Sequence, residues 1–105
     1  MIVTNLKAPY YAVIFTTIVS DNLDGYIETA QRMEELAQKQ QGFLGIESAR
    51  ATIGITVSYW QTLEDIILWK NNIEHIQAKH LGREKWYKQY QLRICKVERE
   101  YGFKQ

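Results

Sequence analysis

The chain has 105 residues, of which 46% are hydrophobic and 24% charged, and its formal net charge at pH 7 is +1. This size and composition predict a single globular domain over residues 1–105. A charge so close to zero provides no field to attract nucleic acid or an acidic membrane, and no apolar run approaches the roughly 20 residues of a membrane helix.

The chain has one cysteine, Cys95. It cannot form an internal disulfide, and without partner thiols it cannot form a zinc site, so no metal is expected. A single thiol favours a reducing compartment. The N-terminus lacks a basic segment followed by an apolar one, so no export signal is expected. Together these features predict a cytoplasmic protein.

The first segments are an arm and a strand. Residues 1–9 predict an N-terminal arm, because Pro9 cannot donate a ladder hydrogen bond. Residues 10–19 predict a strand, since they are rich in Val, Ile, Thr, Tyr and Phe. Its two faces are both largely apolar, with Val13, Phe15, Thr17 and Val19 on one and Ala12, Ile14 and Ile18 on the other. Such a strand has to be covered on both sides.

The next segment, from about Gly25 to Gln41, predicts an amphipathic helix. A polar turn over residues 20–24 precedes it and offers three helix caps, and Gly42 follows it as a natural stop. The three candidate caps are Asp21, Asn22 and Asp24. The predicted buried face carries Ile27, Ala30, Met33 and Ala37, with Tyr26 and Leu36 beside it.

Two short strands follow over residues 43–50 and 54–60, and Gly54 near the turn between them predicts a hairpin. A second helical region begins after Thr62, a good N-cap. Asn71 and Asn72 predict a kink or a second helix start within it. Its inward face is predicted to carry Ile66, Trp69, Ile73, Ile76 and His80.

The last part of the chain is predicted as a helical turn followed by a strand. Gly82 is expected to break the helix, and residues 83–89 to form the turn with Trp86 and Tyr87. The final strand is expected over residues 91–101. The apolar positions in it change from even to odd after Ile94, which predicts a bulge or two buried faces.

The predicted order is therefore strand, helix, strand, strand, helix, strand. This βαββαβ order is that of an α+β ferredoxin-like fold, an antiparallel sheet with helices on one face. The opposite face would be open and apolar. Packing two such sheets face to face would bury both and form a barrel from two chains, so the sequence predicts a homodimer.

Two runs, YWQTLEDIILWKNNIEH and GREKWYKQYQLRICKVEREYGF, resemble the antibiotic biosynthesis monooxygenase domain family. The likeness covers the chain from about Tyr10 to Phe103. It implies a dimeric α+β barrel with a pocket between each subunit's sheet and its helices. Some members of this family oxygenate aromatic polyketides with O2 and without metal or flavin. Others bind and degrade haem, and many have no known reaction.

The haem-degrading relatives use an asparagine in the first strand, a tryptophan in the second helix and a histidine about three turns later. Trp69 matches the tryptophan. The first strand, YYAVIFTTIV, has no asparagine, and His80 lies one residue from the expected histidine position. Haem with His80 as a displaced ligand is therefore the alternative to a protein without a cofactor.

The candidate site residues each have a structural interpretation as well. Trp69 can pack in the core or line a flat aromatic pocket. His75 suits a capping position, and His80 the edge of a pocket, although a histidine can also transfer protons near neutral pH. Arg83 could pair with an anionic group and Tyr87 could donate a hydrogen bond to a phenolate or quinone, yet both residue types are also common dimer anchors.

Three functions follow from these observations. The first is a cofactor-independent monooxygenase that oxidises a small aromatic or quinone-like compound with O2. The second is a haem-binding or haem-degrading protein, and the third is a non-catalytic dimer that binds a small ligand. The catalytic residues predicted for the first are Trp69, His75, His80, Arg83 and Tyr87.

Overall fold

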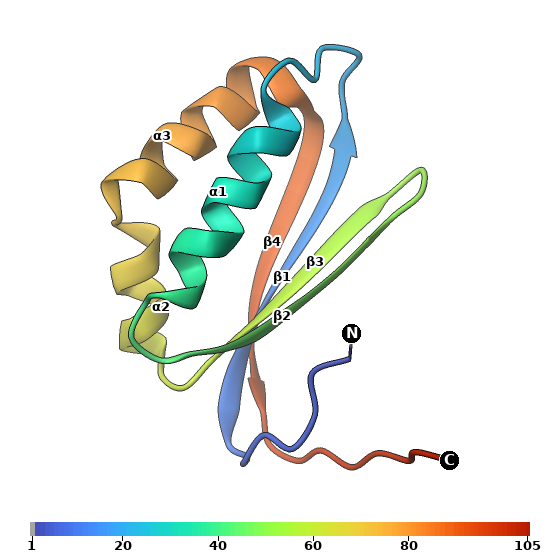
Figure 1. The fold of residues 1–105 in the computed structure, drawn as a ribbon, viewed down its shortest axis with the longest axis vertical. Helices are drawn as coiled ribbons and strands as arrows, with labels where there is room; N and C mark the ends of the chain where they lie inside the picture. The colour runs from blue at the N-terminus through green and yellow to red at the C-terminus, as the bar shows by residue number, and fades with distance from the viewer. Residues whose placement is uncertain (1) are drawn as a thin grey trace.

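The chain folds into one antiparallel sheet with helices packed on one of its faces (Figure 1). The structure is a computed structural model and describes residues 2–105. Its elements are β1 (Tyr10–Val19), α1 (Tyr26–Gln38), β2 (Phe43–Arg50), β3 (Gly54–Trp60), α2 (Leu63–Lys70), α3 (Ile73–Leu81), the π-helical turn η1 (Gly82–Trp86) and β4 (Tyr87–Val97). The strand order is β2-β3-β1-β4. The predicted α+β ferredoxin-like fold is confirmed.

Strand β1 lies inside the sheet and pairs with β3 on one side and β4 on the other. Side chains directly opposite each other across an antiparallel pair share a face. Tyr11 lies opposite Trp60, and Trp60 stacks on Trp69 of α2, so this is the face toward the helices. Successive side chains of a strand point to opposite faces, so Val13 and Phe15, two and four residues after Tyr11, also point toward the helices.

The opposite face of the sheet, which we call the open face, carries the apolar side chains of Ile14, Ile55 and Val57. The segments at both ends of the chain lie on this side of the sheet (Figure 1). The Val3 amide donates to Oε2 of Glu47 at 2.8 Å, and the Tyr59 hydroxyl donates to Oε1 of the same carboxylate at 2.6 Å. The Tyr10 hydroxyl donates to Oε1 of Glu100 at 2.6 Å. The predicted N-terminal arm thus lies against the protein's own sheet at Val3.

Helix α1 is shorter than predicted and differs in the face that it buries. It begins after Gly25, whose φ of 76° suits glycine, and no side chain caps it, so the three predicted caps are wrong. Ile27 is 66% exposed and Ala30 is exposed too, contrary to the prediction. The reason is Tyr26, whose ring packs on Trp86 and Tyr87 and sets the rotation of the helix.

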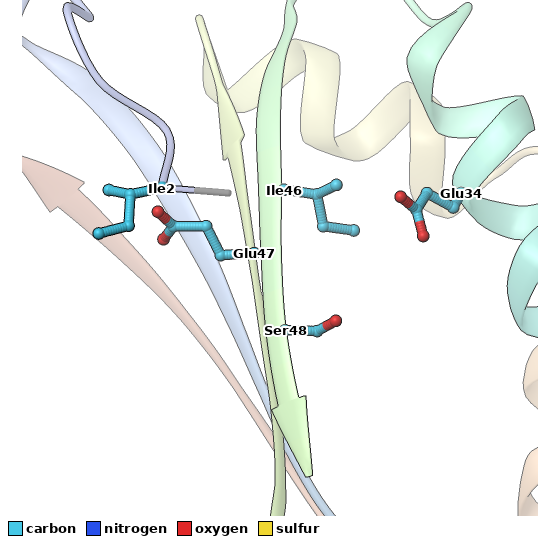
Figure 2. Close-up of a pocket in the computed structure, with 5 residues that line it drawn as sticks. All are labelled: Ile2, Glu34, Ile46, Glu47 and Ser48. Atoms are coloured by element: carbon cyan, nitrogen blue, oxygen red, sulfur yellow. The ribbon is translucent and has the colours of Figure 1, made fainter.

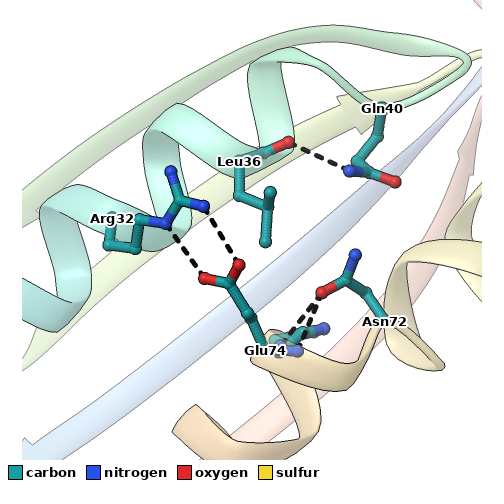
Figure 3. A network of polar contacts seen from close by, with 6 residues as sticks. Arg32, Leu36, Gln40, Asn72 and Glu74 are labelled. Carbon is teal, nitrogen blue, oxygen red and sulfur yellow. Dashed lines mark hydrogen bonds and ion pairs between the residues drawn. The ribbon is translucent and has the colours of Figure 1, made fainter.

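The predicted helix break at Asn71 and Asn72 is confirmed, because α2 ends at Lys70 and α3 begins at Ile73. Asn72 Oδ1 accepts from the amides of Glu74 at 3.0 Å and His75 at 3.3 Å, which makes Asn72 the N-cap of α3 (Figure 3). Thr62 caps α2 as predicted, with Oγ1 accepting from the Asp65 amide at 3.1 Å.

Helices α1 and α3 are joined on their exposed side by one ion pair (Figure 3). Nε of Arg32 lies 2.9 Å from Oε2 of Glu74, and Nη2 lies 3.0 Å from Oε1. The two side chains are 46% and 45% exposed. An exposed pair of this kind contributes little to stability.

The end of the chain departs from prediction at three places. Gly82 does not stop the helix but continues it into η1, and a Cβ there would lie 2.8 Å from the Tyr87 ring, so the residue allows a close approach. Strand β4 begins at Tyr87 and ends at Val97, earlier at both ends than predicted. The register shift lies between Ile18 and Val19 of β1 and not after Ile94.

The inward face predicted for the second helical region is confirmed at Ile66 and wrong at Ile76 and His80, while the side chain of Ile73 lies outside the described part of the structure. Ile66 is 6% exposed, whereas Ile76 is 39% exposed and His80 is exposed as well. The break at Asn71 and Asn72 starts a new helix with a different phase, and the face extrapolated across it is wrong.

The buried apolar residues are Tyr10, Ala12, Ala37, Trp60, Ile66 and Trp86. Tyr10 and Ala12 belong to the open face, and Trp60 belongs to the face toward the helices. Trp60 has no exposed surface. Among residues 2–105, no helix has the length and apolar character needed to cross a membrane.

Candidate functional site

Two groups of aromatic residues lie between the sheet and the helices. We call the first the tryptophan–histidine stack; it consists of Trp60, Trp69 and His75. The Trp60 and Trp69 ring centroids are 6.1 Å apart with 26° between the ring planes. The Trp69 and His75 centroids are 4.4 Å apart at 15°. The break between α2 and α3 turns His75 back onto Trp69, which brings two of the predicted site residues together.

His75 is positioned as a neutral imidazole. Its Nδ1 lies 2.9 Å from the Trp69 carbonyl oxygen, which can only accept, so Nδ1 carries the proton and Nε2 has the free lone pair. Burial lowers the pKa of His75, and nearby Lys79 lowers it further, while the hydrogen bond to Trp69 partly opposes this. A neutral histidine with an unprotonated Nε2 can act as a general base.

The second group, which we call the tyrosine cluster, consists of Phe15, Tyr26, Tyr87 and Tyr90. Tyr87 is at its centre, with ring centroids 5.5 Å from Phe15, 6.0 Å from Tyr26 and 6.1 Å from Tyr90. The cluster is assembled by the fold, since its members come from β1, α1 and β4.

Tyr87 keeps its proton at neutral pH. Burial raises the pKa of its phenol well above the usual value, and the neighbouring Tyr26 hydroxyl raises it further, while the positive charge of Arg50 partly offsets this. A half-buried, protonated phenol is a hydrogen-bond donor for an oxygen that gains negative charge.

Two arginines flank the tyrosine cluster. Nη2 of Arg50 donates to Oγ1 of Thr17 at 2.5 Å and to the Tyr26 hydroxyl at 3.3 Å. Nε of Arg83 donates to the Tyr90 hydroxyl at 2.8 Å, and its Cζ lies 5.9 Å from the Tyr90 ring centroid. The sequence predicted Arg83 but missed Arg50, whose only signal was its place opposite Gly54 across the β2–β3 hairpin.

The five predicted site residues therefore fall into three places. Trp69 and His75 are in the stack, and Tyr87 and Arg83 are in or beside the tyrosine cluster. Most of α3 separates the two groups, about 10 Å for the seven residues from His75 to Gly82. His80 is exposed, and since Gly82 two residues later is buried, His80 lies on the side of α3 away from the sheet.

The helix-facing side of the sheet is open along β4. Leu92 lies opposite Phe15 and Ile94 opposite Val13, so both belong to the face toward the helices. They are nevertheless 47% and 50% exposed. A small apolar molecule can therefore reach this face beside the tyrosine cluster.

Two hollows lie elsewhere on the surface. The larger, about 390 Å³, straddles the edge strand β2, with Ile46 and Ser48 directed toward Glu34 of α1 and Glu47 toward Ile2 (Figure 2). Its lining combines carboxylates, a hydroxyl and isoleucines and holds no aromatic side chain. The smaller, about 180 Å³, is the groove between α1 and α3. Neither contains the groups suited to aromatic chemistry.

The residues do not fit the haem alternative. His80, the displaced ligand, lies on the outer side of α3, and Trp69 is stacked on Trp60 and His75. A separate observation concerns metal ions bound by side chains alone: within residues 2–105, no three His, Cys, Asp or Glu side chains are grouped so that they could hold one.

The chain is 50% identical over 101 residues to the "Uncharacterized protein YqjZ" of Bacillus subtilis (strain 168), covering 94% of this chain and 89% of that protein. The chain belongs to the YqjZ family. No family model matches it. At this identity, the fold described above extends to the YqjZ protein.

Solved structures with low sequence identity share this fold. A putative antibiotic biosynthesis monooxygenase from Nitrosomonas europaea has a TM-score of 0.75 at 11% identity, covering 90% of this chain and 95% of its own. SnoaB, a cofactor-independent oxygenase from Streptomyces nogalater, has a TM-score of 0.75 at 9% identity, covering 89% of this chain and 97% of its own. Rv0793 from Mycobacterium tuberculosis has a TM-score of 0.78 at 8% identity, covering 89% of this chain and 99% of its own. The predicted resemblance to antibiotic biosynthesis monooxygenases is thus confirmed at the level of the fold of this YqjZ-family chain.

Proposed function

We propose that this chain is a cofactor-independent monooxygenase that oxidises a small aromatic or quinone-like compound with O2. The observation that carries the proposal is the tyrosine cluster, where a half-buried, protonated Tyr87 lies on a sheet face that a small molecule can reach. The fold shared with SnoaB, which is described as a cofactor-independent oxygenase, supports it.

The proposed reaction converts an activated aromatic CH2 group into a carbonyl. A base removes one proton, and the remaining anion is delocalised over the ring system. This anion transfers its electrons to O2, and a carbon–oxygen bond forms. The resulting peroxide loses water, so that one oxygen atom remains as the carbonyl and the other leaves in water. The substrate supplies all the electrons, and no further reductant is needed.

Three of the five predicted site residues have a defined part in this scheme, and Arg83 and His80 have none. Tyr87 donates a hydrogen bond to the substrate oxygen that becomes negative, and Nε2 of His75 takes the proton. Trp69, stacked between Trp60 and His75, holds the imidazole in position and is therefore a positioning residue. The helical rise of roughly 10 Å from His75 to Gly82, the residue that packs against the Tyr87 ring, suits a compound of two or three fused rings. His80, on the outer side of α3, has no step in the scheme.

The test is oxygen uptake by the purified protein with anthrone, in the presence of EDTA and without added flavin. We expect one anthraquinone formed for each O2 consumed, at a rate proportional to protein concentration and above the rate without protein. Hydrogen peroxide as the product, or uptake no faster than the uncatalysed rate, would contradict the proposal. Binding of anthrone without uptake would instead favour the non-catalytic ligand-binding dimer.

We also propose that the protein is a homodimer formed by two open faces packed together. Ile55 of β3 is 45% exposed on this face, and Ile14 and Val57 of the same face are half-buried. Analytical ultracentrifugation should show a dimer for the unmodified chain and a monomer for Ile55→Asp. A dimer that persists in Ile55→Asp, while Ile67→Asp on the outer side of α2 dissociates it, would place the interface elsewhere.

A further inference from the structure

We propose that Arg50 makes the site selective for aromatic ligands that carry an anionic oxygen group, such as an aromatic carboxylate. This inference rests on the proposed function and names the class of substrate for the same site. Arg50 would hold the charged group at the edge of the tyrosine cluster, while the rings lie against Phe15 and Tyr87.

The sheet is shaped to let Arg50 reach the cluster. Arg50 is at the end of β2, and its guanidinium crosses β3 at Gly54 to contact Thr17 on β1. A Cβ on Gly54 would lie 2.2 Å from the Arg50 Cζ, so only glycine leaves room for the side chain. Thr17 is only 3% exposed, and its hydroxyl anchors the guanidinium at the inner end of this path.

Arg50 has charge and donors that its protein partners leave unused. Both of its hydrogen bonds are made by Nη2 and both go to neutral hydroxyls, Thr17 and Tyr26. A guanidinium has five N–H donors, so about three remain for a ligand. Among the described residues, the only side-chain ion pair of an arginine is that of Arg32 with Glu74, so no carboxylate neutralises Arg50 or Arg83.

The charge of Arg50 acts at the place where the ligand would bind. Its positive charge lowers the pKa of Tyr87 and so partly offsets the rise caused by burial. Arginine binds carboxylates through charge-assisted hydrogen bonds that are stronger than those between neutral groups. A neutral aromatic ligand would fit the same ring surfaces but would leave this charge unpaired.

The experiment compares two probes of equal shape, anthraquinone-2-carboxylate and anthraquinone-2-carboxamide, titrated into the full chain by calorimetry at pH 7. We expect the carboxylate to bind at least about tenfold more tightly, as one charge-assisted hydrogen bond provides. Arg50→Gln should abolish this preference and Arg50→Lys should retain part of it. Arg99→Gln is the matched control, because Arg99 lies nine residues beyond Tyr90, about 30 Å along an extended chain.

Equal affinity for both probes, a preference that survives Arg50→Gln, or no binding of either probe would overturn the inference. Oxygen uptake with anthrone, which is neutral, is measured on the same preparations. Uptake without a carboxylate preference would overturn the role of Arg50 alone. A carboxylate preference without uptake would overturn the proposed reaction and leave an anion-selective ligand site.

Discussion

The tryptophan–histidine stack and the tyrosine cluster are both aromatic, but they satisfy their polar atoms differently. In the stack, Nε1 of Trp60 donates to Oγ of Ser58 at 2.9 Å and His75 binds the Trp69 carbonyl, so the partners are internal. In the tyrosine cluster, the hydroxyls of Tyr26 and Tyr90 depend on arginines that are exposed. Internal partners stabilise the fold, whereas exposed ones can be exchanged for a ligand.

The largest expected effect is a loss of stability on mutation in the tryptophan–histidine stack, which should far exceed the loss on mutation in the tyrosine cluster. Trp60→Ala removes a side chain with no exposed surface and should lower the free energy of unfolding by about 3–5 kcal/mol. Urea denaturation followed by circular dichroism measures this. Tyr87→Phe, the counterpart in the tyrosine cluster, should change stability by no more than about 1.5 kcal/mol. If Tyr87→Phe costs more than Trp60→Ala, the stack is not the stabilising group.

The next effect is on activity, and it is expected for a mutation in the tyrosine cluster. Tyr87→Phe keeps the ring but removes the donor, and should lower the rate of oxygen uptake with anthrone about 10- to 100-fold, somewhat less than the loss of a donor in a dedicated oxyanion hole. Tyr101→Phe is the control, because Tyr101 is 100% exposed after β4, and its rate should equal that of the unmodified chain. Equal rates in both variants would remove Tyr87 from the chemistry.

A third effect concerns His75 and the decline of the free energy of unfolding as the pH falls below neutrality. The pKa of His75 is lowered in the folded protein, whereas in the unfolded chain it is about 6.5. As the pH falls below about 6.5, the unfolded state binds the proton first, so this contribution to stability is complete above that pH and is lost as the pH falls toward the folded pKa. The slope from this one group is at most about 1.4 kcal/mol per pH unit.

Replacing His75 by glutamine should therefore flatten the decline in stability just below pH 6.5, as measured by urea denaturation at several pH values. His80→Gln provides the comparison, since His80 is exposed and lies away from the stack. A decline of the same slope in His75→Gln as in the unmodified chain would show that His75 does not cause it.

The smallest effect on stability is expected for Gly54→Ala, at roughly 1 kcal/mol or less, because the group that it displaces is the flexible end of Arg50. The variant should nevertheless lose the preference for anthraquinone-2-carboxylate to the same extent as Arg50→Gln. Calorimetry with the two probes tests this. A preference unchanged in Gly54→Ala would mean that Arg50 reaches the ligand by another path.

Much of the fold could be predicted from local sequence. The bounds of β1, β2 and β3 agree with prediction, because β-branched and aromatic runs end at clear signals such as Pro9 and Gly54. The start of β4 could not be found in this way. The segment from Tyr87 to Gln91 is mostly polar, and Gly82 before it serves a contact with the Tyr87 ring that has no local signature.

The candidate site was less predictable, because its geometry depends on contacts between distant segments. Asn71 and Asn72 predicted the helix break that brings His75 onto Trp69, although the contact between the two rings was not itself predicted. His80 was predicted to be buried because the buried face of α2 was extended through it. A new helix, α3, starts at the N-cap Asn72 with a different phase, and His80 is exposed. Arg50 reaches the tyrosine cluster only through the strand order, which places β3 between β2 and β1.

The position of β1 has a consequence for how the protein can be made. One edge of β1 is occupied by β4, with Tyr10 opposite Val97, so this central strand is completed by the element that comes last in the chain. During synthesis β1 keeps an unpaired edge and two apolar faces until β4 emerges, the arrangement that promotes association between chains. Fragments that end before Tyr87 should accumulate as aggregates, and slower translation of the codons for β4 would lower the yield of folded protein.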